Sequence, residues 1–168
     1  MLLAFRIFHI LAGVLWVGAV IFVAMFLMPS LRAAGPAGGP VMSQLTQRKM
    51  PIYMMAMAII TILSGTGLIW INSAGYPGSW MQTSMGRTYG WGGLLAILAA
   101  IVGMAMSSPA VRKMGAIAQG IAKRGGPPTP EESAEMQRLQ GRMALSIKIV
   151  SVLVLLATTA MAVARYLP

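Results

Sequence analysis

The chain contains a single histidine, His9, which lies inside a long apolar stretch near the start of the sequence. Gly13 and Trp16 follow it by four and seven residues, so an α-helix places all three on one face. A neutral imidazole can ligate haem iron or copper, and Gly13 would leave space for a flat macrocycle beside the ring. Met161, at a similar depth in the last apolar stretch, is a candidate thioether partner for such a site.

The alternative role for His9 is structural. An imidazole exposed to lipid is costly, so a histidine in a membrane segment usually faces a neighbouring helix. Hydroxyl groups at matching depth are supplied by Ser64, Thr66, Thr158 and Thr159. We expect a hydrogen bond between His9 and one of these helices, and we favour this role over haem ligation.

Methionine is the other residue type with ligand chemistry, and the chain has 16 of them. Met54, Met55 and Met57 form a cluster, and thioethers suit copper(I). No histidine or cysteine lies at the same depth as this cluster. Because methionine also fills irregular cores well, we predict that these side chains serve packing and that the chain has no metal site.

The remaining inventory excludes most catalytic chemistry. Cysteine and aspartate are absent, and the only carboxylates, Glu131, Glu132 and Glu135, fall close together in the sequence. Thiolate metal sites, disulfides, an Asp-oriented triad and carboxylate-rich metal cages therefore cannot be built. We expect a protein without catalytic activity of its own.

Four apolar stretches are long enough to cross a bilayer, whose hydrocarbon core of about 30 Å requires about 20 residues of helix. They cover residues Leu2–Met28, Ile52–Ile71, Tyr89–Ser107 and Ala144–Ala164. The sequence therefore predicts an all-α polytopic membrane protein. We expect one domain, residues 1–168, in which four transmembrane helices form an antiparallel bundle joined by long loops at 29–51 and 108–143.

The charge distribution predicts the orientation of this bundle. Of 13 lysines and arginines, only Arg6, Arg87 and Arg165 lie outside the two long loops and their flanks. The positive-inside rule then places both long loops in the cytoplasm and both termini outside, as in a bacterial-type inner membrane. The same rule explains the net charge of +10 without nucleic acid, and the basic loops should attract anionic lipid headgroups.

Short sequence motifs predict the structure of the segments that connect the four apolar stretches. The residues AAGPAGGP at 33–40 predict a flexible linker, followed by a short interfacial helix within Val41–Met50. Pro109–Arg124 predicts a short basic amphipathic segment, either a helical extension of the third span or a piece that lies along the headgroups, and GGPP at 125–128 ends it. Thr129 as N-cap, Pro130 at the first helical position and Glu132 three residues after the cap predict a capping box. The last helix should therefore run from near Pro130 to about Tyr166.

The first two apolar stretches resemble those of a known group of small helical membrane proteins. FRIFHILAGVLWVGAVIF, with His9, Trp16 and Gly18, resembles the opening helix of the copper-resistance CopD-type superfamily, which includes HemJ-type protoporphyrinogen oxidases. The basic start and the Thr-then-Gly ending of the second stretch, Arg48 to Gly65, are also similar. The resemblance implies haem b ligation by His9. The lysine that HemJ-type enzymes carry four residues after a third-helix tryptophan is missing after Trp91.

Two functions follow from these observations. The first is an accessory or assembly subunit, without catalytic activity, that packs against a larger respiratory or photosynthetic membrane complex or against its own copies. Small residues on the third stretch, such as Gly92, Ala96 and Gly103, would allow close helix packing. The second is a haem b- or porphyrin-binding protein of HemJ or CopD type, with His9, Gly13, Trp16 and Met161 at the site.

Overall fold

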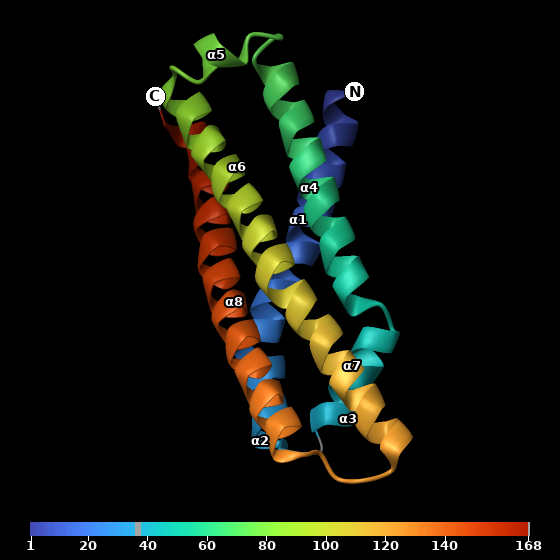
Figure 1. Ribbon diagram of the computed structural model, residues 1–168. Helices are drawn as coiled ribbons and strands as arrows, with labels where there is room; N and C mark the ends of the chain where they lie inside the picture. Colours follow the sequence, from blue (N-terminus) through green and yellow to red (C-terminus); the bar gives the residue numbers. More distant parts are fainter. Residues whose placement is uncertain (36–37, 168) are drawn as a thin grey trace.

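The computed structural model describes residues 1–35 and 38–167, and the part it describes is helical with no β-strand. Four helices are long and apolar enough to span a membrane, namely Leu2–Ala33, Met50–Asn72, Ser84–Arg124 and Pro130–Tyr166. They run up and down as an antiparallel bundle, and both chain termini lie at the same end (Figure 1). The predicted all-α architecture of four spans is confirmed.

The bundle consists of two helix pairs. α1 (Leu2–Phe22) packs along α4 (Met50–Asn72), and α6 (Ser84–Val102) packs along α8 (Pro130–Val163), whereas α4 and α6 meet over a much shorter stretch. Small side chains make the second pairing close, because Ala96, Ala99 and Ala157 are buried in the shared core with Trp16 and Val154. In lipid such close backbone approach is a main source of helix association.

One end of the bundle carries most of the additional helices, and we call it the basic end. It contains α2 (Met28–Ala33), α3 (Gly38–Gln47) and α7 (Ser108–Arg124), together with the start of α8 (Figure 1). A second small core of Ala110, Leu139 and Met143 holds α7 against α8 there. The other end, which we call the terminal end, contains only the short α5 (Pro77–Trp80) and η4 (Ala164–Tyr166).

The first and third long helices each contain a π-helical segment followed by a proline. η1 (Val23–Leu27) precedes Pro29, and η3 (Gly103–Ser107) precedes Pro109, with the proline at the second position of the next helix in both cases. Proline has no N–H to donate to the carbonyl four residues earlier. For Pro109 that carbonyl belongs to Ala105, and Arg142 of α8 donates to it from Nη2 at 3.0 Å.

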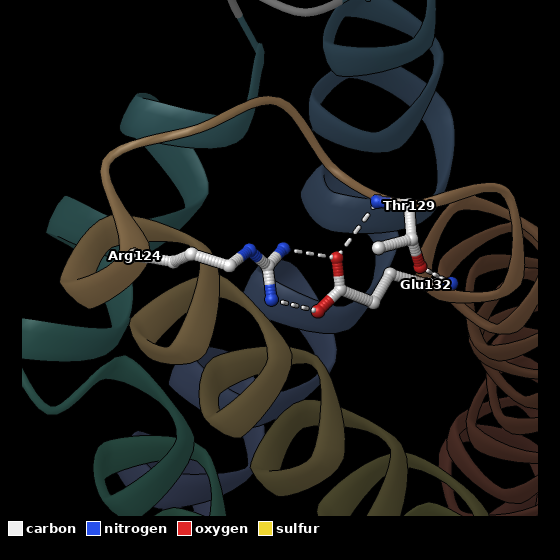
Figure 2. Close-up of polar contacts among 3 residues, drawn as sticks. All are labelled: Arg124, Thr129 and Glu132. Carbon is white, nitrogen blue, oxygen red and sulfur yellow. Dashed lines mark hydrogen bonds and ion pairs between the residues drawn. The ribbon is translucent and has the colours of Figure 1, made fainter.

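The start of α8 is fixed by the predicted capping box. The Thr129 hydroxyl accepts from the backbone N–H of Glu132 at 3.2 Å, and the Glu132 carboxylate accepts from the N–H of Thr129 at 2.8 Å. Arg124, the last residue of α7, forms a bidentate pair with the same carboxylate (Figure 2). Gly125 ends α7 in the left-handed conformation with φ of 69°, which glycine adopts without strain.

Some connections differ from the sequence prediction. The linker predicted at residues 33–40 is wrong over Gly38–Pro40, which form the first turn of α3, while residues 36 and 37 lie outside the described part. Proline is tolerated in a first helical turn because the N–H it lacks would have no intrahelical partner. Of the two alternatives for the basic segment after the third span, the structure shows the helical extension, because α7 continues the long helix Ser84–Arg124.

Candidate functional site

His9 lies on α1 and faces α4. Its Nδ1 is 2.8 Å from the backbone carbonyl oxygen of Thr61 and 3.4 Å from the Ser64 hydroxyl. A carbonyl oxygen can only accept, so Nδ1 is the protonated nitrogen and donates this bond. In the neutral ring Nε2 is then the nitrogen with the free lone pair, and it makes no hydrogen bond to the described residues.

The receiving surface on α4 is polar but internally satisfied. Thr61 and Ser64 are both buried, and each hydroxyl donates back to its own helix, to the carbonyls of Met57 and Ile60. Each buried hydroxyl therefore has a hydrogen-bond partner on its own helix and does not need His9. The Thr61 carbonyl has a second lone pair, and the imidazole uses it to connect α1 to α4 across the bundle.

Glycines on α4 bring the two helices close enough for this bond. A methyl group added at Gly65 would lie 2.9 Å from Cε1 of His9, and one at Gly67 would collide with the ring of Phe5. On α1, the corresponding position at Gly13 would be 3.7 Å from the Thr61 methyl. The space beside Gly13 is therefore taken by Thr61, and the imidazole itself packs over Gly65.

The other candidate ligands belong to different contacts. Trp16 is 4% exposed and lies in the bundle core, together with buried residues of α4, α6 and α8. Met161 on α8 packs against α6, where a methyl added at Gly92 would meet its side chain at 3.0 Å. His9, in contrast, has its hydrogen bonds and its closest glycine on α4.

Among the hydroxyl partners suggested for His9, the structure supports one. Ser64 lies within 3.4 Å of Nδ1, whereas Thr66, Thr158 and Thr159 donate to carbonyls of their own helices. The main acceptor, a backbone carbonyl, was missed because sequence reasoning considered side chains. A helix carbonyl already accepts an intrahelical bond, and only the close glycine packing brings it within reach of the ring.

The ion pairs among the described residues lie at the basic end, outside the apolar part of the helices. The Arg124 guanidinium lowers the pKa of Glu132 below its ordinary value of 4.5, and the backbone N–H of Thr129 adds to the effect. Arg138 lowers the pKa of Glu135 in the same way, through bonds of 2.8 Å. Two of the three carboxylates of the chain are therefore committed to ion pairs on α7 and α8.

A cleft between the two helix pairs is a feature that sequence reasoning did not predict. It has a volume of about 200 Å³ and lies in the half of the bundle toward the basic end. Seven methionines line it, including Met54 and Met55 of α4, Met104 of η3 and Met143 of α8. We call it the methionine-lined cleft. Of the three methionines that are clustered in the sequence, Met54 and Met55 line this cleft. The other five lining methionines come from elsewhere in the chain.

No family model, curated protein or solved structure matches the chain.

Proposed function

We propose that the chain is a multi-pass inner-membrane protein of bacterial type that acts as an accessory subunit beside a larger respiratory or photosynthetic membrane complex, without catalytic activity of its own. The observation that carries this proposal is the 2.8 Å bond between His9 and the Thr61 carbonyl. It gives the one histidine of the chain a structural task, that of joining α1 to α4. The ion pairs of Glu132 and Glu135 likewise support a structural use of the carboxylates.

The outer surface of the bundle supports a role in assembly. Gly18 on α1 and Gly93 on α6 have open space where a side chain would project, with no atom of the described chain within 4 Å. Small residues that face outward allow the backbone of another helix to approach closely. The partner helix would belong to another subunit or to a second copy of this chain.

Native gel electrophoresis of membranes solubilised in mild detergent tests this proposal. The wild-type chain should migrate with a larger complex, and Gly18→Leu should release it because the new side chain occupies the contact surface. The stability of the isolated chain should not fall, since no neighbouring helix lies near Gly18 and leucine has the higher helix propensity. Leu63→Phe, at a position that is 65% exposed on α4, is the matched control and should leave the complex intact.

Migration of the wild-type chain as a free monomer would rule out the accessory role. So would an assembly that is equally sensitive to Leu63→Phe and Gly18→Leu, because a general change of the lipid-facing surface would then explain the loss.

The second candidate is a haem b- or porphyrin-binding protein of CopD or HemJ type. The state of the imidazole favours it, because Nδ1 donates to a backbone carbonyl and Nε2 keeps its lone pair, as in many metal-ligating histidines. The surroundings of Gly13 fit a haem less well, because the Thr61 methyl fills the space next to this glycine. When bound, haem would supply redox chemistry, and His9 would hold the iron through Nε2.

Absorption spectroscopy distinguishes the two candidates. A protein that uses His9 for packing should purify without a Soret band. A stoichiometric Soret band that disappears in His9→Asn and His9→Gln would reject the structural role and establish the haem site.

A further inference from the structure

The methionine-lined cleft has the length of one lipid leaflet. On α4 its lining residues extend from Met50 near the basic end to Ile62 in the middle of the bundle. These twelve steps of helix cover about 18 Å, and half of a hydrocarbon core of about 30 Å is about 15 Å. The cleft thus begins where a headgroup region would lie and ends near the centre of the bilayer, at Trp16 and Ile62.

The walls of the cleft share an unusual backbone feature. η1 contributes Val23 and Leu27, and η3 contributes Gly103, Met104 and Ser107. π-Helical turns are rare, they widen a helix locally, and they occur frequently at functional sites. Here both of them line the same cleft, one from each helix pair, and each is followed by a proline that helps to define its end.

The lining is suited to a flexible apolar chain. Apart from Ser107 and Ser108 all lining side chains are apolar, and the Ser107 hydroxyl already donates to Ser146 at 2.9 Å. Methionine side chains have three rotatable bonds and adapt to irregular shapes. A rigid polar ligand would find few hydrogen-bond partners here, whereas a hydrocarbon chain needs none.

Two basic residues adjoin lining residues of the cleft at the basic end. Lys49 precedes the lining residue Met50, and Arg112 follows the lining residue Val111; both basic residues are exposed. The three carboxylates of the chain are all at the start of α8, where Glu132 pairs with Arg124 and Glu135 with Arg138. Within the described residues no carboxylate pairs with Lys49 or Arg112, so an anion from outside would complement them.

We propose that the methionine-lined cleft binds one acyl chain of an anionic phospholipid from the leaflet at the basic end, with the phosphate at Lys49 and Arg112. The length of the cleft matches the chain, its lining matches hydrocarbon, and its rim matches the charge of the headgroup. This site does not depend on the accessory role proposed above, since it needs only the chain and a bilayer.

Trp16 provides a probe at the deep end of the cleft. It is 4% exposed, against 60% for Trp70 and 63% for Trp91, so ordinary boundary lipid reaches it poorly. A chain with Trp70→Phe, Trp80→Phe and Trp91→Phe retains Trp16 alone and is reconstituted into phosphatidylcholine vesicles. Phosphatidylglycerol brominated near the end of its acyl chain is added at a low mole fraction, and brominated phosphatidylcholine is added in a parallel series. Fluorescence quenching should be several-fold stronger with the anionic lipid.

The charged rim gives the matched comparison. Lys49→Gln and Arg112→Gln should each lower the preference for the anionic lipid roughly five-fold, the share expected for one basic residue at a membrane surface. Lys123→Gln and Arg165→Gln, tested singly, each remove one charge away from the cleft and should leave the preference unchanged. All variants are compared at equal helical content by circular dichroism, which separates loss of binding from loss of fold.

Equal quenching by the two lipids, no quenching by either, or an anionic preference that survives both rim substitutions would each overturn the proposal. Stoichiometric copper(I) binding that is lost in Met54→Leu with Met55→Leu would also overturn it, because the methionines would then hold a metal. Quenching that is selective for the anionic lipid and sensitive to the rim supports the phospholipid site.

Discussion

At the scale of single residues, the hydrogen bond of His9 joins α1 to α4. The donor is Nδ1 and the acceptor is a backbone carbonyl that no side-chain substitution on α4 removes. Interhelical hydrogen bonds in membrane proteins contribute about 0.6 kcal/mol on average, so this one positions α1 more than it stabilises the fold.

Replacement of His9 tests this role. In His9→Asn the side-chain amide nitrogen can take the place of Nδ1 and donate to the Thr61 carbonyl, so the free energy of unfolding should stay near the wild-type value. His9→Leu cannot donate and should lose about 0.6 kcal/mol. Unfolding in mixed detergent micelles measures the difference, and a leucine variant as stable as the asparagine variant would contradict the structural role.

Substitution of a glycine on α4 should change the free energy of unfolding more than substitution of His9 does. Gly65→Ala places a methyl group 2.9 Å from Cε1 of His9, so the ring or the helix must move, at a cost of about 1–3 kcal/mol. Gly93→Ala on α6 has open space and should gain up to about 1 kcal/mol from helix propensity. Unfolding measurements on both variants should therefore give shifts of opposite sign. A Gly65→Ala protein of unchanged stability would mean that α1 and α4 are farther apart.

At the scale of helices, the sequence predicted what local signals determine. Thr129, Pro130 and Glu132 specify a helix start through short-range hydrogen bonds, and α8 begins at Pro130 as expected. The four apolar stretches are set by composition and were found at the predicted places. The π-helical segments were not predicted, because a π-turn depends on how the helix packs against its neighbours. Pro29 and Pro109 were the only local signs of them.

The start of α8 should respond to acid. Because the folded pKa of Glu132 is lowered, its stabilising effect is fully present above the ordinary value of 4.5 and is lost as the pH falls through the lower folded value. The protection of the amides over residues 131–139, corrected for the intrinsic pH dependence of exchange, should therefore fall as the pH drops below 4.5, with the apolar part of α8 unaffected. Thr129→Ala should cause similar fraying at neutral pH, at a cost of about 1 kcal/mol. Protection that stays constant through this pH range would contradict the bidentate pair with Arg124.

Arg142 and Pro109 should be energetically coupled. Arg142 donates to the Ala105 carbonyl, which Pro109 leaves without its helical donor. Arg142→Ala should cost about 1 kcal/mol in the wild-type background and much less after Pro109→Ala, which restores an N–H at that position. A double-mutant cycle of unfolding free energies measures this coupling. Additive effects of the two substitutions would show that Arg142 does not serve the carbonyl.

At the scale of the whole molecule, the arrangement of the helices could not be derived from sequence. Small residues on the third span indicated close packing, and Gly92 and Ala96 are indeed buried, but nothing local specified that α6 would pair with α8 and α1 with α4. The methionine-lined cleft results from that pairing, because the two pairs meet only in part. His9 and Met161 could be matched in depth from sequence, yet their contacts fall on different pairs.

The two ends of the bundle differ in charge, and this difference predicts its orientation. Both termini lie at one end, and α3, α7 and the start of α8 lie at the other (Figure 1). Ten of the 13 basic residues belong to the second group and its flanks, so the basic end should face the cytoplasm. The chain has no cysteine, so single introduced cysteines report on topology without background.

Ser43→Cys on α3 and Ala122→Cys on α7 should resist an impermeant thiol reagent in intact cells and react after the cells are opened. Ser79→Cys on α5, which is also exposed in the structure, should react in intact cells because it lies at the terminal end. All three positions are exposed in the structure, so a difference in labelling between intact and opened cells reports the side of the membrane. Labelling of Ser43→Cys and Ala122→Cys but not Ser79→Cys in intact cells would show that the bundle has the opposite orientation. The mouth of the methionine-lined cleft would then face the outer leaflet, and His9 would lie in the cytoplasmic half.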